Sequence, residues 1–204
     1  MNGATCQAFS DIVSGAEDGD HDMSEARIRF TFNPEKALEV LVWIARKWPD
    51  ISFYYMVKVL YYADKEHLNR FGRPILGDRY IAMEHGPVPS VVYDMLGRDS
   101  FLEPDLIAKV EASLEFALGR PPTVRAKRDA DMRLLSRTDI ECLQNAVSQI
   151  SGMPISRLRI LTHQEAAYAA ATLNGEMDYA LMLEGPDRDR RLADIRETAG
   201  AVAI

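Results

Sequence analysis

The stretch that decides the fold is Lys58-Val-Leu-Tyr-Tyr-Ala-Asp-Lys-Glu-His-Leu-Asn-Arg-Phe-Gly-Arg-Pro-Ile-Leu-Gly-Asp-Arg-Tyr-Ile-Ala-Met-Glu-His-Gly-Pro-Val-Pro89. It predicts an amphipathic helix that stops at Gly72, then a turn, a short alternating strand at 79–83 and a rigid Gly-Pro-Val-Pro elbow. None of these parts is an obvious catalytic device. Together they predict a shaped surface that holds another molecule.

The sequence on either side of this stretch is mainly helical. Asn33-Pro34 supplies an N-cap and a proline at the first helical position, which predicts a helix to about Lys47. Ser52 is a plausible cap for the next helix, which reaches about Phe71. A capping box is expected at Ser136-x-x-Asp139, with aspartate in place of the usual glutamate or glutamine. Further helices are expected at 90–95, 104–118, 137–150, 155–161, 165–173 and 186–198.

Short alternating runs predict the strands. Residues 27–32 alternate strictly between polar and apolar side chains, and 79–83, 123–126 and 132–135 are the other strand candidates. Strands this short and few need helices to cover one face. The expected fold class is therefore α+β, predominantly α-helical: a compact helical domain with a small antiparallel β-sheet of three or four short strands.

The net charge of −7 is unevenly distributed. Residues 1–26 hold six acidic residues and no lysine or arginine, which leaves 25 acidic against 24 basic residues in the remainder. We therefore expect a disordered acidic leader at 1–26, a main domain at 27–183, and a C-terminal helix and tail at 184–204. The nearly neutral body lacks the strongly basic character that is typical of nucleic-acid-binding domains.

Cysteine usage and hydropathy indicate the cellular compartment in which the chain is expected. Cys6 and Cys142 are the only cysteines, and they form neither a metal-ligand spacing nor a disulfide framework. No apolar run approaches the length that spans a membrane. We expect a reduced, cytoplasmic protein that does not interact with a membrane.

Tyrosines give the clearest physical indication of a binding face. Tyr54, Tyr55, Tyr61 and Tyr62 lie on one helix, and a 3.6-residue period cannot bury all four. Partly exposed tyrosines are favoured at protein interfaces because they combine a large contact area with a polar tip. A broad apolar stripe in a closely surrounded helix is the alternative explanation.

Histidines and carboxylates suggest a second, enzymatic hypothesis. Asp64 and His67 stand one helical turn apart, a spacing that suits two metal ligands. A metal-dependent hydrolase or nuclease would need these two residues to converge with His85 and His163. The sequence lacks His-Glu-x-x-His, Gly-x-Ser-x-Gly, P-loop and Cys-x-x-Cys motifs. We therefore expect no enzyme, no catalytic residue, no metal and no cofactor.

A basic segment suggests a third hypothesis. Residues 120–137 carry six basic against two acidic side chains, which could meet an acidic protein or a phosphate backbone. A DNA-binding autoregulator of its own operon would use Arg125, Lys127, Arg128 and Arg133. No aromatic side chain is interleaved for base stacking, and a solvated basic face is the plainer explanation.

The chain also resembles a known family, the SocA-like antitoxins, also called the Panacea domain. The resemblance rests on Phe-Asn-Pro-Glu-Lys-Ala-Leu-Glu-Val-Leu (32–41), Lys-Val-Leu-Tyr-Tyr-Ala-Asp (58–64), His-Leu-x-Arg-Phe-Gly-Arg-Pro-Ile (67–75), Gly-Asp-x-Tyr-Ile-Ala-Met-x-His-Gly-Pro-Val-Pro (77–89), Leu-Ser-x-x-Asp (135–139) and Leu-Thr-His-Gln-Glu (161–165). It spans most of 27–183, and the 77–89 block is its most specific part.

This resemblance implies a role in binding. Family members neutralise a toxin protein encoded beside them, and SocA-type members also suggest delivery of the bound toxin to the ClpXP protease. We therefore expect a type II antitoxin whose helical face and Gly-Pro elbow grip a toxin. The expected partner-binding residues are Tyr61, Tyr62, Asp64, Tyr80, His85, Gly86, Pro87, Val88 and His163.

Overall fold

The structure, a computed structural model, describes residues 27–201, with side chains described to residue 198. The expected leader at 1–26 lies outside the described residues. The helices are α1 Pro34–Lys47, α2 Phe53–Phe71, α3 Ser90–Gly97, α4 Pro104–Ser113, α5 Arg137–Ile150, α6 Ile155–His163, α7 Ala166–Ala169 and α8 Arg188–Ala201, with short 3-10 helices η1 Met132–Leu134 and η2 Tyr179–Met182. The strands are β1 Ile51–Ser52, β2 Tyr80–Met83, β3 Gly86–Pro89, β4 Leu114–Ala117 and β5 Thr123–Ala126.

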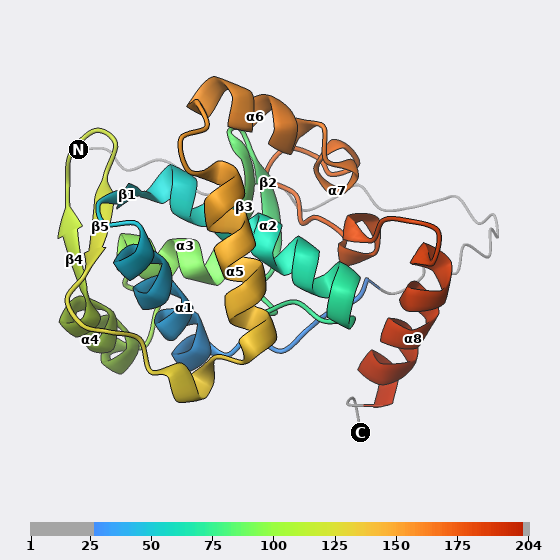
Figure 1. The fold of residues 1–204 in the computed structure, drawn as a ribbon, viewed down its shortest axis with the longest axis horizontal. Helices are drawn as coiled ribbons and strands as arrows, with labels where there is room; N and C mark the ends of the chain where they lie inside the picture. The colour runs from blue at the N-terminus through green and yellow to red at the C-terminus, as the bar shows by residue number, and fades with distance from the viewer. Residues whose placement is uncertain (1–26, 202–204) are drawn as a thin grey trace, which may run out of the picture.

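The predicted class, α+β with helices dominant, is confirmed, but the strands form two small antiparallel sheets instead of one. One sheet has the order β1-β5-β4, and the other is the β2–β3 hairpin. Figure 1 shows the first sheet at one side of the molecule, beside α1 and α4, and the hairpin near the centre with its upper end against α6.

Helix α2 lies at the centre of the fold and packs closely against α5 and β3. Its ends follow from local chemistry. The Ser52 hydroxyl accepts a hydrogen bond from the Tyr55 amide, and Gly72 ends the helix in the left-handed region at φ +74°. The capping box at α5 is confirmed, since Ser136 and Asp139 exchange backbone-to-side-chain hydrogen bonds of 3.1 and 2.9 Å.

Two buried clusters form the core. The larger one joins α1, α2, α3 and α5 through aliphatic side chains such as Leu41, Leu60 and Leu143. The smaller one brings Tyr61, Tyr80 and Tyr179 together in edge-to-face contacts, with ring centroids 5.4 and 6.1 Å apart. The smaller cluster therefore attaches the C-terminal segment to α2 and the hairpin.

Four expected elements differ in the structure. The helix expected at 104–118 ends at Ser113, because Leu114–Ala117 pairs with β5 and places Leu114 in the core and Glu115 in solvent. The strand expected at 132–135 is η1, and the helix expected at 165–173 is limited to α7. Residues 27–32 are extended but unpaired with either sheet; Ile28 is buried and Phe30 packs on Tyr179.

The Gly-Pro-Val-Pro segment was expected as an elbow and is instead strand β3. Its prolines are tolerated because the residues opposite Pro87 and Pro89, which are Ala82 and Tyr80, direct their backbone groups away from β3 and toward residues 174–177. Ala82 bonds to Asn174 and Gly175 at 2.8 and 2.9 Å, and the Tyr80 carbonyl accepts from Met177 at 2.8 Å. The hairpin is thus held on its other edge by the segment after α7.

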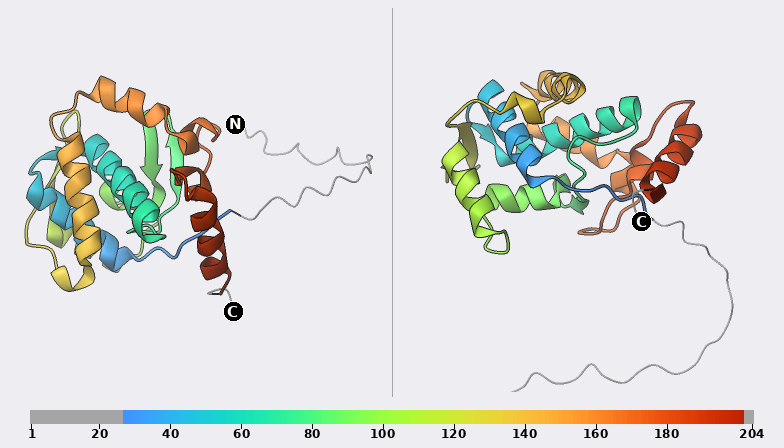
Figure 2. Two further views of the ribbon diagram at one scale, coloured as in Figure 1. Left: turned by 45° about the vertical axis from the view of Figure 1, so that its right-hand side comes forward. Right: turned by 90° about the horizontal axis from the view of Figure 1, so that it is seen from below.

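Helix α8 closes one edge of the molecule, beside the extended segment 27–32 (Figure 2). A groove of about 890 Å³ lies between α8, this segment and the end of α2, lined by Arg29, Phe71 and Ile195 among others. No helix in the described part of the chain is long and apolar enough to cross a membrane.

Candidate protein-binding site

Two buried carboxylates, Asp64 and Asp78, hold the backbone of the stretch 58–89 in place. Asp64 of α2 accepts hydrogen bonds from the amides of Ile75 and Leu76 at 2.8 and 3.2 Å and from the Tyr80 hydroxyl at 3.0 Å. Burial is the main cause that raises the pKa of Asp64 to about 6. This carboxylate therefore anchors the turn that leads from α2 to the hairpin.

The second buried carboxylate, Asp78, holds the start of α3. Its carboxylate accepts from the amides of Val91 and Val92 at 3.1 and 2.9 Å, so it caps a helix that has no side-chain cap of its own. The Tyr179 hydroxyl donates to the Asp78 carbonyl at 2.5 Å. Burial raises the pKa of the Asp78 carboxyl.

Gly86 brings the hairpin close to α2 and α6. Its φ of +98° lies in the region that favours glycine. A Cβ at this position would meet the Thr162 hydroxyl oxygen at 2.6 Å and the Lys58 Nζ at 3.1 Å. The glycine therefore allows three segments, at 58, 86 and 162, to meet at one point.

Ion pairs and hydrogen bonds connect α2 to the segment that follows α6. Lys65 pairs with Glu165 and, at 2.6 Å, with Glu184, while the Tyr61 hydroxyl donates to Glu165 at 3.2 Å. The Tyr168 hydroxyl donates to the Met83 carbonyl at 2.8 Å. The two sequence blocks at 58–89 and 161–165 thus form one rigid unit.

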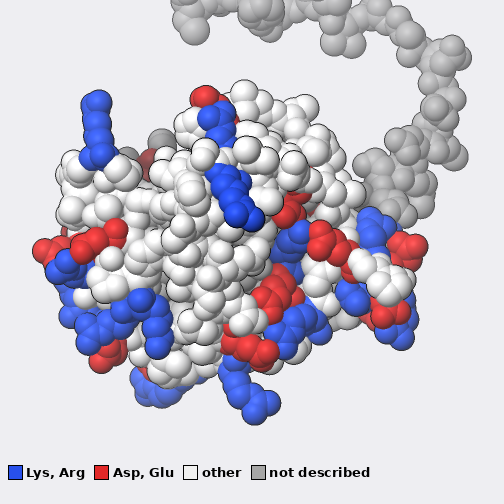
Figure 3. Space-filling view, turned by 45° about the horizontal axis from the view of Figure 1, so that its top comes forward, with Lys and Arg blue, Asp and Glu red and all other residues white. Residues whose placement is uncertain are grey.

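The surface of this unit is formed by the hairpin turn and α6. Only Leu158 and Thr162 of α6 are buried, whereas Ile155 and Ile160 are 48% and 59% exposed. Figure 3 shows a largely white surface on this side of the molecule, from whose upper middle a few basic side chains rise, with most other charged side chains toward the edges. We call Ile155, Arg159, Ile160 and His85 the α6 face.

Beneath the α6 face lies a group of polar side chains without an acidic partner. Lys58 is fully buried and donates a hydrogen bond of 2.7 Å to the Pro87 carbonyl. Its ammonium lies 5.3 Å from the centre of the Tyr54 ring. Burial lowers the pKa of Lys58 to about 7. Among the described residues, Tyr54 Oη and His163 Nε2 are buried with no hydrogen-bond partner.

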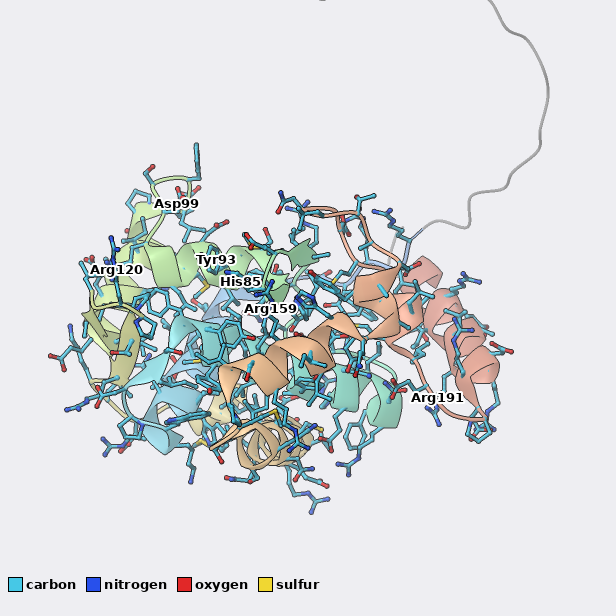
Figure 4. All side chains as sticks on the ribbon, turned by 90° about the horizontal axis from the view of Figure 1, so that it is seen from above. His85, Tyr93, Asp99, Arg120, Arg159 and Arg191 are labelled. Atoms are coloured by element: carbon cyan, nitrogen blue, oxygen red, sulfur yellow. The ribbon has the colours of Figure 1, made fainter. Side chains whose placement is uncertain are left out.

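Arg159 and His85 stand at the outer side of this group. Figure 4 shows both at the hairpin end of α6, and the charges of Arg159, Lys58 and His85 all act on the His163 imidazole. Burial, followed by the Arg159 charge, lowers the pKa of His163. His163 also stacks on Tyr168, with ring centroids 4.5 Å apart.

The predicted partner-binding residues divide by burial. Tyr61, Asp64 and Tyr80 lie in the interior, where their hydroxyl and carboxylate groups are bonded to other residues, so a direct contact between these side chains and a partner does not fit the structure. Gly86, Pro87 and Val88 are buried, Tyr62 and His163 are half-buried, and His85 is exposed. Of these residues, Gly86 lies directly against α6 at Thr162, whereas Asp64 and Tyr80 belong to the turn after α2.

The residues proposed for a metal-dependent hydrolase do not converge. Asp64 faces the turn after α2, whereas His67 Nδ1 lies 2.7 Å from the Arg73 carbonyl and its Nε2 lies 3.2 Å from Asp139. His163 and His85 belong to the hairpin end of α6. Within residues 27–198, no group of three histidine, cysteine or acidic side chains has the geometry to hold a metal ion.

The basic segment proposed for DNA binding is largely neutralised. Arg128 forms a two-pronged ion pair with the buried Glu39 at 2.6 and 2.7 Å, and this contact is the main cause that lowers the pKa of Glu39. Arg125 pairs with Asp50, Arg133 with Asp131 at 2.6 Å, and Lys127 donates to the Glu111 carbonyl. Three of these four cations are paired with carboxylates, which weakens the local positive field.

Sequence reasoning missed Tyr54, Lys58 and Arg159 as members of one site. The available signal was their spacing: Tyr54 and Lys58 stand four residues apart on α2, as do Arg159 and His163 on α6. That pairing says which side chains share a helix face. It does not say that the two faces meet, since that depends on the hairpin between them.

Comparison with known families agrees with the residues that form this unit. The chain matches the family described as "Antitoxin SocA-like, Panacea domain" over residues 56–168, which includes most of α2 and all of the hairpin, α5 and α6. No curated protein and no solved structure matches the chain. The match covers more than half of the sequence, so the chain belongs to the SocA-like antitoxin family, and this membership supports an antitoxin-type role.

Proposed function

We propose that this protein is the antitoxin of a type II toxin–antitoxin pair and neutralises the toxin encoded beside it by direct binding. Membership of the SocA-like antitoxin family is the observation that carries the proposal. The absence of nucleophile, phosphate-binding and dinucleotide-binding motifs from the sequence agrees with a role that involves no catalysis.

The α6 face is the surface we assign to the toxin. Its exposed isoleucines and its arginine have the composition of a protein interface, in which an apolar centre is anchored by a few large side chains. The hairpin and α2 beneath it are fixed by buried hydrogen bonds, so little ordering is required when a partner binds.

The proposal extends to the fate of the toxin and to its location. A bound toxin that is passed to ClpXP would be degraded in the cytoplasm, and a sterically blocked toxin would persist. Toxin half-life in cells with and without ClpX separates these two modes. A half-life that does not depend on ClpX excludes the adaptor mode and leaves direct neutralisation.

Co-expression with the product of the adjacent reading frame tests the proposal. We expect the neighbouring protein to arrest growth alone, growth to recover when this chain is co-expressed, and the two proteins to purify together. If the neighbouring product is harmless, or if growth recovers without a complex between the two proteins, the proposal is wrong.

A further inference from the structure

The group beneath the α6 face consists of hydrogen-bond donors and cations whose partners are incomplete. An ammonium carries three donors, yet Lys58 makes one hydrogen bond, to the Pro87 carbonyl at 2.7 Å, and one contact with the face of the Tyr54 ring. Neither Lys58 nor Arg159 forms a salt bridge within the described part of the chain. A fully buried lysine without a counter-charge is costly, so its retention requires an explanation.

Two further polar atoms lie in the same place. Tyr54 Oη and His163 Nε2 are buried, and neither has a hydrogen-bond partner among the described residues. Such atoms are uncommon in folded proteins because each loses its hydration without compensation. A hydrogen bond to the Glu84 backbone accounts for the other side of the His163 ring and leaves Nε2 available.

Arg159 is the exposed member of this group. It stands one helical turn before His163 on α6, so both side chains lie on the same side of the helix. Its positive charge is among the causes that shift the pKa of Tyr54 and of His163, which agrees with its place on the same side of α6 as His163. Arg159 is exposed, whereas Tyr54 and His163 are half-buried and Lys58 is fully buried, so an anion that approaches the α6 face meets Arg159 first.

We propose that Tyr54, Lys58, Arg159 and His163 form a binding site for a carboxylate side chain of the partner protein. A carboxylate has two oxygens that accept hydrogen bonds. The exposed Arg159 guanidinium would bind one oxygen at the surface, and the hydroxyl of the half-buried Tyr54 would bind the other once its ring turns outward. Lys58 is fully buried, so it would contribute its positive charge from beneath without touching the carboxylate. We call these four residues the carboxylate site. The inference rests on the proposed function, because it describes the chemistry by which the toxin is recognised.

The surroundings favour a protein carboxylate over a nucleic-acid phosphate. Ile155 and Ile160 are exposed on α6, and the surface on this side of the molecule is largely uncharged apart from a few basic side chains (Figure 3). A phosphate backbone requires several cations along a continuous track. The basic side chains at 125–133 are already engaged in ion pairs or hydrogen bonds within the protein. A single acidic side chain in an apolar patch fits this arrangement better.

Small anions test the site without a toxin. Sodium acetate is titrated into the isotopically labelled full-length protein at pH 7, with sodium chloride of equal ionic strength as the control and sodium phosphate as a parallel titration. We expect acetate to cause saturable shifts of the His163 ring and Lys58 side-chain NMR signals. We expect apparent affinity to fall at least tenfold in Lys58→Met and Arg159→Gln. An acetate response no different from chloride, or a stronger response to phosphate, would overturn the inference.

Matched variants on α6 supply the control. Arg157 is exposed and lies about 160° around the helix from Arg159, so Arg157→Gln removes the same charge from another side. We expect Arg157→Gln to bind acetate as the wild type does. Arg159 is also exposed, so its replacement keeps the fold and decides the test even if Lys58→Met does not fold.

The toxin assay separates this inference from the proposed function. We expect Arg159→Gln to weaken toxin binding at least tenfold and Arg157→Gln to leave it unchanged. Toxin binding that is insensitive to Arg159→Gln would overturn the carboxylate site and keep the antitoxin proposal. Acetate binding in a protein that binds no neighbouring toxin would keep the anion site and reject the antitoxin proposal.

Discussion

The Lys58 ammonium lies 2.7 Å from the Pro87 carbonyl, so a fully buried lysine of α2 holds the strand that follows the hairpin turn. This contact joins two residues 29 positions apart, near the two ends of the stretch 58–89 that decides the fold. A proline has no amide hydrogen, but its carbonyl remains an acceptor. The strand therefore depends on a side chain from α2 for a bond that a sheet neighbour would otherwise supply.

The pKa of about 7 for Lys58 gives the first prediction, a pH-dependent stability. Between about pH 7 and pH 10 the unfolded chain retains a proton that the folded protein has released, so stability rises with pH, by at most about 1.4 kcal/mol per unit. Below pH 7 both states carry the charge and the buried cation weakens the fold. We expect Lys58→Met to have a higher free energy of unfolding than the wild type at pH 6. This advantage should disappear by pH 9. Urea denaturation of both proteins at the two pH values measures the difference, and a constant gap would contradict the assignment.

Gly86 gives a prediction about geometry. Gly86→Ala adds a Cβ 2.6 Å from the Thr162 hydroxyl oxygen at a residue with φ of +98°, and we expect a loss of about 1–3 kcal/mol. A second change, Thr162→Ala, removes the contact but not the backbone strain, so it should recover part of the loss. Gly97→Ala is the matched control, because no atom lies within 4 Å of its Cβ and alanine favours a helix. Equal effects at 86 and 97 would show that the close approach is unimportant.

Asp64 gives a prediction about the turn after α2. Asp64→Ala leaves the amides of Ile75 and Leu76 and the Tyr80 hydroxyl without their acceptor, and we expect a cost of about 2–4 kcal/mol. Asp64→Asn keeps an oxygen for the two amides and should cost much less. Since the pKa is raised from 3.8 to about 6, the carboxyl favours folding most below pH 4, and this contribution is lost as the pH rises to about 6. The difference in free energy of unfolding between Asp64→Asn and the wild type, measured by chemical denaturation, should change between about pH 4 and pH 6 and stay constant above it.

The sequence allowed most helix ends to be predicted because their signals are local. Asn33, Ser52 and Ser136 accept hydrogen bonds from the first turns of their helices, and Gly72 supplies the left-handed residue that ends α2. Strand β4 could not be found in this way. Leu114 and Phe116 fit both a helical and an alternating pattern, and the choice between them is made by pairing with β5.

The candidate site was only partly predictable for a similar reason. Periodicity indicates that a helix with four tyrosines cannot bury all of them, but it does not indicate which ones stay exposed. Tyr61 is buried against Tyr80, which packs in turn on Tyr179, and Tyr179 comes from a segment more than 100 residues later in the chain. The exposed α6 face carries no motif, since ordinary isoleucine and arginine side chains form it.

The α6 face gives the last prediction, which concerns partner binding. Ile160 is 59% exposed on α6, so Ile160→Asp should leave the fold intact while it places a charge in the apolar centre of the proposed interface. We expect at least a tenfold loss of affinity for the toxin by calorimetry, together with loss of growth rescue, and an unchanged midpoint of thermal unfolding. Leu118→Asp is the control, because Leu118 is 77% exposed at the end of the β4–β5 sheet, away from α6 (Figure 1). If Leu118→Asp impairs binding and Ile160→Asp does not, the toxin binds the opposite side of the molecule and the α6 face must be abandoned.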